Sequence, residues 1–167
     1  MKTLINVLLL LVKNWIKDVQ EDDKNKMNTL RFIKTDPRAV TPTRAHPTDI
    51  GYDLTAIDIW KVLSDQTIIF ETGIAIQPPS GKYIEILPRS SVTKTGLMLA
   101  NSVGVIDLDY TGSLKIAVRL VDTTLGIPEL PFCKFQLVMR TADLYEIEEV
   151  EEFAKTERGD GGFGSTG

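Results

Sequence analysis

The chain has little of several residue types on which proteins build particular sites. Its 167 residues include one cysteine, Cys133, which excludes a disulfide within the chain and is typical of a reducing compartment. The one histidine, His46, lies in a proline-flanked loop, which argues against a histidine metal ligand or catalyst. Nineteen basic residues against 23 acidic ones give a net charge of −4, without the basic excess of a general nucleic-acid binder. We therefore expect no nucleic-acid partner and a cytoplasmic location, or a nuclear one in a eukaryotic or viral setting.

A hydrophobic run long enough to span a bilayer is also missing from the sequence. The most apolar stretch, Leu4–Val12, follows Lys2 but is shorter than the roughly 20 residues that a membrane span requires. No small-residue cleavage site follows it, as a signal peptide would need. Three interpretations of residues 1–26 stay open: a helix that binds a membrane surface, a helix that self-associates, or a native start at Met27. The amphipathic helix would present one apolar face, made of Leu4, Leu8, Leu11, Trp15 and Val19.

What the sequence does have is a pattern of short strands and frequent turns. Residues 113–121 alternate, with Leu114, Ile116, Val118 and Leu120 on one face. Similar short runs, separated by glycine and proline, occur at 67–70, 74–76, 83–87 and 135–139. Only residues 90–95 resemble a helical turn, capped by a serine. The pattern predicts one all-β domain with a sandwich or jelly-roll architecture.

The last ten residues are rich in glycine and have no sequence after them to pack against. They contain Gly159-x-Gly161-x-x-Gly164, but a dinucleotide fingerprint needs a strand before it and a helix after it. Glycine amides, an arginine and hydroxyls suit phosphate binding, and the ring of Phe163 suits a nucleobase. We interpret this segment as a flap, joined to the body by the acidic arm at 148–157; a plain disordered tail is the alternative.

Four sequence motifs, taken in order, resemble those of the trimeric dUTPase family. They are Ala-His-Pro-Thr-Asp-Ile-Gly-Tyr-Asp-Leu at 45–54, Pro-Arg-Ser-Ser at 88–91, Asn-Ser-Val-Gly-Val-Ile-Asp-Leu-Asp-Tyr-Thr-Gly at 101–112, and the glycine-rich tail. The resemblance covers about residues 27–167. It divides the chain into an extension at 1–26, a β domain at 27–148, and an arm with the flap at 149–167.

The family resemblance implies a fold, an assembly and an activity. The fold is a jelly-roll-like subunit, and the assembly is a homotrimer whose active sites are shared between subunits. The activity is Mg²⁺-dependent hydrolysis of dUTP to dUMP and pyrophosphate, which lowers dUTP and supplies dUMP for dTTP synthesis. A dCTP deaminase of the same fold would carry a glutamate in the strand after the turn, and residues 113–121 contain no acid. A catalytically silent binding domain is the other alternative.

The resemblance also assigns roles to residues of the third motif. Asp107 would activate the attacking water, while Asp109, facing the other way on an extended segment, would not. Tyr110 would lie under the sugar and exclude a 2′-hydroxyl. Main-chain groups would read uracil, and Lys115 is assigned a weaker contact through its backbone. Uracil would be read by Asn101 and by the backbone of Val105, Ile106 and Asp107, while Gly104 would keep the pocket open or the turn tight.

The remaining assignments concern the phosphates and the metal. Arg89, Ser90 and Ser91 would bind phosphate at the start of a helical turn. Asp53 would support Mg²⁺ through bound water, because Mg²⁺ keeps several waters and takes phosphate oxygens. The other substrate-binding residues implied by the resemblance are Gln136, Arg158, Phe163, Gly164, Ser165 and Thr166.

The fourth motif departs from the family pattern. Relatives commonly carry Arg-x-Ala-Gln, whereas this chain has Cys133-Lys134-Phe135-Gln136. Lys134 would point to the opposite face from Cys133 on a regular strand. The departure leaves open the geometry of the phosphate contacts and of the subunit contacts near this strand.

Overall fold

The structure is a computed structural model that describes residues 13, 17 and 29–161. Within this part the fold is all-β, as the sequence predicts, and two short 3-10 helices interrupt the strands. All of the N-terminal extension except residues 13 and 17 lies outside the described residues, and so does the apolar face predicted for an amphipathic helix there. No helix in the described part is long and apolar enough to cross a membrane. The elements in chain order are β1 (Arg31–Lys34), β2 (Tyr52–Ala56), β3 (Asp58–Ser64), β4 (Thr67–Glu71), β5 (Ile74–Gln77), β6 (Lys82–Pro88), η1 (Ser90–Lys94), β7 (Leu97–Leu99), β8 (Gly104–Ile106), β9 (Lys115–Leu120), η2 (Thr123–Leu125) and β10 (Phe132–Thr141).

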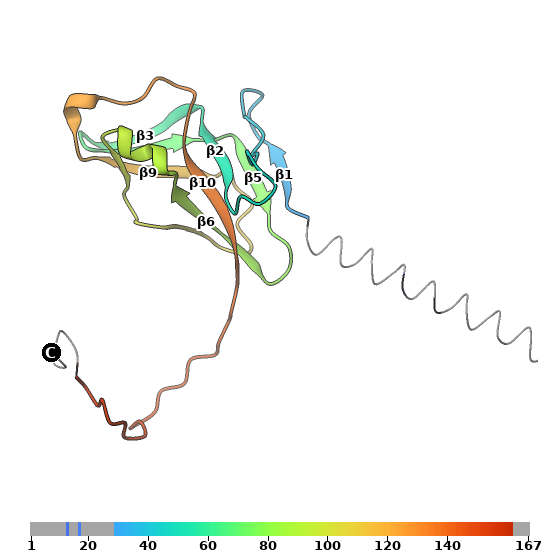
Figure 1. The fold of residues 1–167 in the computed structure, drawn as a ribbon, viewed down its shortest axis with the longest axis vertical. Coiled ribbons are helices and arrows are strands. Elements are labelled where there is room, and N and C mark those ends of the chain that lie inside the picture. The colour runs from blue at the N-terminus through green and yellow to red at the C-terminus, as the bar shows by residue number, and fades with distance from the viewer. Residues whose placement is uncertain (1–12, 14–16, 18–28, 162–167) are drawn as a thin grey trace, which may run out of the picture.

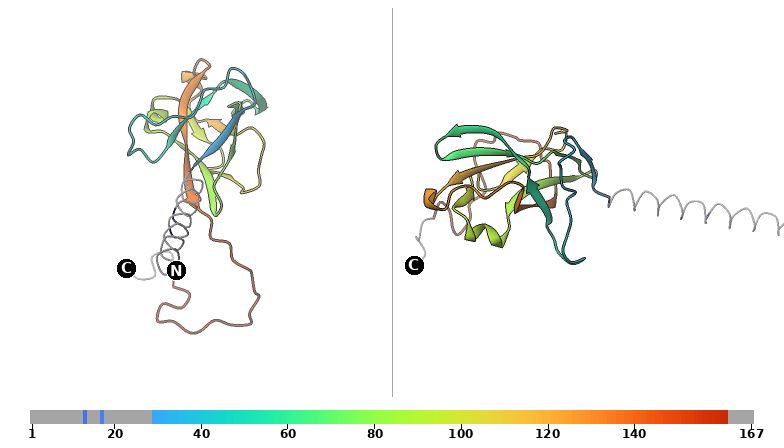
Figure 2. Two further views of the ribbon diagram at one scale, coloured as in Figure 1. Left: turned by 90° about the vertical axis from the view of Figure 1, so that its right-hand side faces the viewer. Right: turned by 90° about the horizontal axis from the view of Figure 1, so that it is seen from above.

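The strands form three antiparallel sheets that pack around one core (Figures 1 and 2). One four-stranded sheet has the order β2-β10-β6-β8, and the other has the order β3-β4-β9-β7. A two-stranded ribbon of β1 and β5 completes the body. The first sheet matters most for function, because β2, β6, β8 and β10 carry or precede most of the predicted site residues.

The alternation in the sequence correctly predicts which side chains enter the core. In and just before β9, Leu114, Ile116 and Val118 are buried, whereas Leu120 is partly exposed at the strand end. Strands β4, β5, β6 and β10 coincide with the apolar runs to within three residues at each end. Phe70 and Phe132 meet edge to face in the core, with ring centroids 5.0 Å apart. Burial of these apolar faces is the main force that holds the sheets together.

Several elements differ from the sequence prediction. The helix η2 is a second helical turn, so the expectation of a helical turn only at residues 90–95 is wrong. The 3-10 helix η1 begins at Ser90, and its N-cap is Arg89, whose side chain makes no capping hydrogen bond. The expected serine cap is therefore wrong, because both serines lie inside the turn. Strand β3 was not predicted, since Trp60, Val62 and Leu63 are more than half exposed and do not follow a buried–exposed alternation.

After β10 the chain leaves the body of the protein as an extended segment, residues 142–161 (Figure 1). This segment begins before the predicted arm and includes it, and we call all of it the arm from here on. Residues 142–150 have no regular secondary structure. Several large apolar side chains of the arm are almost fully exposed: Leu144 at 80%, Tyr145 at 84%, Ile147 at 100% and Phe153 at 88%. An arm with this much exposed apolar surface has the composition of a segment that packs against another surface.

Candidate active site

The predicted phosphate-binding and metal-binding residues meet on neighbouring strands. Arg89 directly follows β6, Asp53 lies on β2, and Gln136 lies on β10 between them. The guanidinium Nη1 of Arg89 lies 3.0 Å from the carboxylate Oδ2 of Asp53, and both side chains are about one-third exposed. We call Asp53, Arg89 and Gln136 the Arg89 cluster. It combines a charged fork of donors with a carboxylate at the protein surface.

Gln136 is held in this cluster by its own hydrogen bond and by a glycine beneath it. Its Nε2 donates to the carbonyl of Pro88 at 3.0 Å. A Cβ atom at Gly51 would lie 2.0 Å from Gln136 Oε1, so any other residue at this position would require the Gln136 side chain to move. Gly51 is absent from the predicted site residues, although its position in the first motif, two residues before Asp53, is a signal for a role.

Ser90 and Ser91 open the 3-10 helix η1, immediately after Arg89. Ser90 is exposed and Ser91 is partly exposed, so the two residues that follow Arg89 in the chain carry hydroxyls at or near the surface. Charge and hydroxyl donors side by side are a common arrangement for binding phosphate oxygens.

The departure in the fourth motif is absorbed by an irregularity in β10. The pairing of β10 with β2 shifts register between Phe132 and Phe135, which are both buried although they are three residues apart. Cys133 and Lys134 are both partly exposed, and the direction of the Lys134 side chain relative to Cys133 stays a prediction. The Cys133 sulfur accepts a hydrogen bond from Arg89 Nη1 at 3.2 Å. Phe135 is fully buried and acts in core packing.

The third motif forms a hairpin around β8 on the other edge of the same sheet. Gly104 is buried, and a Cβ there would lie 3.0 Å from the Cβ of Ile86 and 3.6 Å from Nδ2 of Asn101. Glycine thus allows the hairpin backbone to lie against β6. Ser102 has a positive φ of 62°, which lets the chain turn sharply between Asn101 and Gly104. Val105 remains 58% exposed, so main-chain groups of the hairpin stay near the surface.

Asp107 follows β8 and opens a turn instead of continuing the strand. The amide of Tyr110 donates to the carbonyl of Asp107 at 3.2 Å, which closes the turn. The expectation that Asp107 and Asp109 face opposite sides of an extended segment is therefore wrong on two grounds: residues two apart on a strand share a face, and this segment is a turn. Both aspartates line a surface groove together with Tyr83, Leu108 and the start of the arm. Among the described residues, the Asp107 carboxylate has no hydrogen-bond or ion-pair partner.

Tyr110 and Lys115 are each fixed by short contacts. The Tyr110 hydroxyl donates to the carbonyl of Ser113 at 2.9 Å, and the ring is 40% exposed. The Lys115 ammonium lies 2.7 Å from the carboxylate of Glu71 and 5.4 Å from the ring centre of Trp60. The Lys115 ammonium is thus engaged in an ion pair with Glu71, and the substrate contact through the Lys115 backbone stays a prediction.

The Arg89 cluster and the Asp107 hairpin lie at opposite ends of β6. Ile106, next to Asp107, pairs with Ile84 near the start of β6, and Arg89 follows the last residue of that strand. At about 3.4 Å per residue, the five steps from Ile84 to Arg89 correspond to roughly 17 Å. The structure of one chain thus forms two of the predicted groups of residues without bringing them together.

The third group, the flap, lies mostly outside the described residues. This applies to Phe163, Gly164, Ser165 and Thr166. Arg158 is described, and its Nε donates to the carbonyl of Gly161 at 2.9 Å on the exposed end of the arm. Its predicted contact with phosphate stays a prediction.

Comparison with known proteins identifies the family. The family model for dUTPase matches residues 38–167, which is most of the chain.

The chain belongs to the dUTPase family.

Curated relatives in the dUTPase family support this assignment at moderate identity. The deoxyuridine 5′-triphosphate nucleotidohydrolase of Corynebacterium diphtheriae is 36% identical over 149 residues, which cover 88% of this chain and 98% of the relative. The enzyme of the same name from Mycobacterium tuberculosis H37Rv is 35% identical over 146 residues, which cover 83% and 95%.

Solved dUTPase structures resemble the described fold. A mutant dUTPase of staphylococcal bacteriophage 80alpha with dUpNHpp has a TM-score of 0.71 at 28% identity, covering 84% of this chain and 99% of that one. A mutant dUTPase from phage phi11 of S. aureus, described with a structural Mg(II) ion, has a TM-score of 0.64 at 27% identity, covering 75% and 99%.

The donor set of this chain fits the Mg²⁺ that the dUTPase family uses. No group of three or more histidine, cysteine, aspartate or glutamate side chains comes together in the described part of the chain. Mg²⁺ does not need such a group, because it commonly keeps waters and takes phosphate oxygens beside one carboxylate. Asp53 has a partly exposed carboxylate of this kind next to Arg89.

Proposed function

We propose that the Asp107 carboxylate activates the water that attacks the α-phosphate of dUTP. The overall reaction, hydrolysis of dUTP to dUMP and pyrophosphate, is that of the dUTPase family to which the chain belongs. The observation that carries the proposal is the position of Asp107 directly after the β8 hairpin, in a surface groove, with no partner among the described residues. An unpaired carboxylate has free lone pairs to accept a proton from water.

The bond changes follow from this arrangement. The water oxygen forms a bond to the α-phosphorus as its proton passes to Asp107, and the bond to the bridging oxygen breaks. Pyrophosphate leaves with the electron pair of that bond. Arg89 and the hydroxyls of Ser90 and Ser91 would bind the phosphate oxygens, where negative charge is concentrated. Mg²⁺, supported by Asp53 through water, would neutralise part of that charge.

Selectivity for deoxyuridine is proposed to reside in the hairpin and the turn after it. The backbone at Val105 and Ile106, with Asn101, presents donors and acceptors on a rigid edge, because Gly104 lies tightly against β6. Such an edge can match uracil and mismatch cytosine. Tyr110, held at Ser113, would occupy the space that a ribose 2′-hydroxyl requires.

The protein is proposed to act as a homotrimer with active sites shared between subunits. One consideration supports this: a general base must lie within hydrogen-bond reach of its water, yet Asp107 and Arg89 lie at opposite ends of β6. One chain would supply Asp107 to a site, and a second chain would supply Arg89 to the same site. Closure of the site by the flap residues, from Arg158 to Thr166, would complete it.

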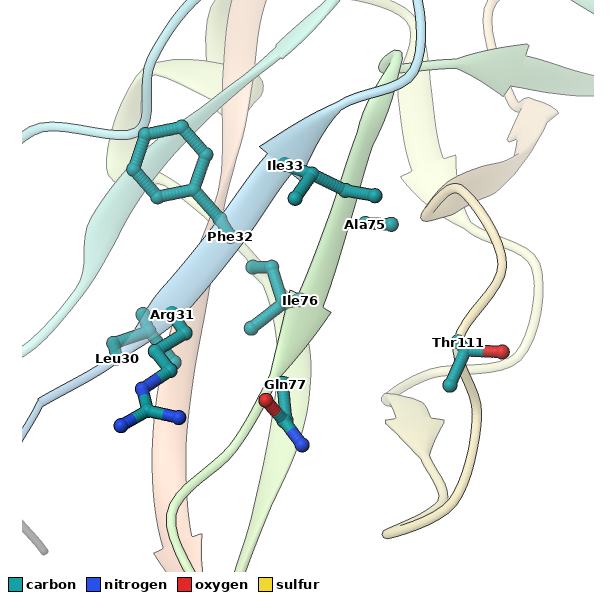
Figure 3. Close-up of a pocket in the computed structure, with 8 residues that line it drawn as sticks. All are labelled: Leu30, Arg31, Phe32, Ile33, Ala75, Ile76, Gln77 and Thr111. Carbon is teal, nitrogen blue, oxygen red and sulfur yellow. The ribbon is translucent and has the colours of Figure 1, made fainter.

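The exposed arm is the second support for a shared assembly. Its apolar side chains need a surface to pack on, and an apolar groove lies along β1 and β5 beside Thr111 (Figure 3). In this groove Ile33 and Ala75 lie on the side toward Thr111, and Phe32 points to the other side of β1 (Figure 3). The groove therefore borders the loop that follows Tyr110.

The cytoplasmic location stays a prediction.

Release of pyrophosphate from dUTP, dTTP, dCTP and UTP with Mg²⁺ tests the proposed function. We expect turnover confined to dUTP. Asp107→Asn keeps the shape of the side chain but removes the base, so dUTP binding should persist while turnover falls by at least about 100-fold. The matched control is Asp109→Asn in the same turn, which should stay within a few-fold of the native protein. Full turnover in Asp107→Asn would overturn the assignment of the base.

A further inference from the structure

One carboxylate outside the proposed site collects an unusual number of hydrogen bonds. Glu71, at the end of β4, accepts from the backbone amides of Thr72 at 2.9 Å and Gly73 at 2.8 Å. It also accepts from the hydroxyl of Ser113 and forms an ion pair with Lys115 at 2.7 Å. The Glu71 side chain is 19% exposed. A partly buried carboxylate with four donors is firmly fixed, because each of the donors would otherwise lose its partner.

These contacts lead directly to Tyr110. The carbonyl of Ser113, whose hydroxyl is bound to Glu71, accepts from the Tyr110 hydroxyl at 2.9 Å. The same carbonyl accepts from the Lys115 ammonium at 3.2 Å. Ser113 is therefore bound on one side by the Glu71–Lys115 pair and on the other by the tyrosine.

Two further features hold the Ser113 segment against the end of β4. The buried Thr72 hydroxyl donates to the carbonyl of Leu114 at 2.8 Å, and the amide of Leu114 donates to the carbonyl of Ile74 at 2.7 Å. The Tyr110 hydroxyl lies over Gly112, where a Cβ would come within 2.5 Å of it. The position of the Tyr110 hydroxyl is thus defined by Gly112 and Ser113, and the end of β4 holds the Ser113 segment in place.

We propose that Glu71 is a positioning residue that orients Tyr110 through Ser113 and thereby sets the discrimination between deoxyribose and ribose. The proposal rests on the role of Tyr110 in the proposed function. The ring of Tyr110 is 40% exposed, and its hydroxyl is bound to the Ser113 carbonyl. Loosening Ser113 would let the ring move and admit a 2′-hydroxyl, without touching the base Asp107.

The experiment measures kcat/KM for dUTP and for UTP in the native protein, four test variants, one double variant and one control variant, and reports the dUTP-to-UTP ratio. Ser113→Ala removes the hydroxyl that joins Glu71 to the segment and keeps the carbonyl that binds Tyr110. Glu71→Ala removes the whole anchor, and Glu71→Gln keeps an oxygen that accepts from the two amides and Ser113. Tyr110→Phe removes the hydroxyl of the tyrosine. A net hydrogen bond corresponds to roughly fivefold, so we expect the dUTP-to-UTP ratio to fall about fivefold in Ser113→Ala and at least as far in Glu71→Ala.

Three readouts separate positioning from a general loss of structure. Glu71→Gln should recover most of the native ratio. In Ser113→Ala and Glu71→Ala, the fall in the dUTP-to-UTP ratio should come mainly from a higher kcat/KM for UTP, with kcat for dUTP changed less than about threefold. Ser113→Ala combined with Tyr110→Phe should lose no more than the larger single variant, because both break one connection. The matched control is Asp58→Asn: Asp58 is the cross-strand partner of Glu71 and pairs with Arg38 instead, so the ratio should stay native.

The outcomes distinguish this proposal from the proposed function. A native protein that hydrolyses dUTP and UTP equally overturns the role of Tyr110 and, with it, the role of Glu71. A native protein that prefers dUTP, with unchanged preference in folded Ser113→Ala and Glu71→Ala, overturns the role of Glu71 alone. Thermal unfolding checks that each variant is folded, and Ser113→Ala, a loss of one hydroxyl, carries the test if Glu71→Ala does not fold.

Discussion

A site shared between subunits makes a quantitative prediction for mixtures of two inactive variants. Asp107→Asn lacks the proposed base, and Arg89→Ala lacks the guanidinium beside Asp53. In one chain these residues lie at opposite ends of β6, roughly 17 Å apart along the strand, so one substrate phosphate cannot contact both. Because each variant lacks one residue that every site needs, an assembly made of one variant alone should be inactive or nearly so.

In a mixed assembly, some sites would receive both native residues. A site that takes Asp107 from one chain and Arg89 from another is complete when the first chain is Arg89→Ala and the second is Asp107→Asn. With equal amounts and random assembly, each condition holds for half of the chains. About a quarter of the sites should then be complete, and the mixture should regain about a quarter of the native rate.

The assay is coexpression of the two variants, followed by size-exclusion chromatography and pyrophosphate release from dUTP. Mass spectrometry of the intact assembly establishes that both variants are present in one particle. A control mixture of the single variant Asp107→Asn with the double variant Asp107→Asn/Arg89→Ala should stay inactive, because neither chain supplies the base. Inactivity of verified mixed particles, or a protein that sediments as a monomer while fully active, would refute the shared site.

Three further predictions concern packing, the glycine under Gln136, and pH. Phe135→Ala should lower the free energy of unfolding by about 3–5 kcal/mol, because Phe135 is fully buried. Urea denaturation at fixed protein concentration measures this, and a loss below about 1 kcal/mol would contradict the role of Phe135 in the core. Gly51→Ala should displace Gln136 from Pro88 and raise KM for dUTP roughly fivefold, and an unchanged KM would show that this contact does not serve binding. Burial tends to raise the pKa of Glu71, but hydrogen bonds from Lys115, Ser113 and Gly73 outweigh it and the pKa is lowered. Because its pKa is lowered, the Glu71 carboxylate stabilises the folded state at pH values above the ordinary pKa of glutamate, and this contribution is lost as the pH falls through the lowered value. The native protein should therefore lose more stability below about pH 4 than Glu71→Gln does. Equal dependence of stability on pH in the two proteins would contradict this.

Much of the fold was predictable because strand burial leaves a period of two in the sequence. Residues 113–121 show it, and β9 occupies their centre with Ile116 and Val118 buried. Strand β3 was not predictable in this way, because its apolar residues are exposed on an edge strand and no alternation marks it. The irregularity of β10 at Cys133 was likewise hidden, since a register shift depends on the pairing with β2.

The candidate site divides in the same way. The order of the motifs alone pointed to Asp53, Arg89, Asp107 and the tail, because each motif carries its own local chemistry. Their mutual positions were not in the sequence. The pairing of Arg89 with Asp53 and Cys133 depends on which strands are neighbours in the β2-β10-β6-β8 sheet.

By itself, the sequence determined the all-β class, the family and the residue types of the site, because alternation and motif chemistry are local properties of the chain. Only the tertiary structure decided that Asp107 and Arg89 stand at opposite ends of β6 and that Glu71 reaches Ser113 beside Tyr110. The physical reason is that strand pairing joins residues far apart in the chain. Glu71 and Ser113, which are 42 positions apart, meet only because β4 pairs with β9.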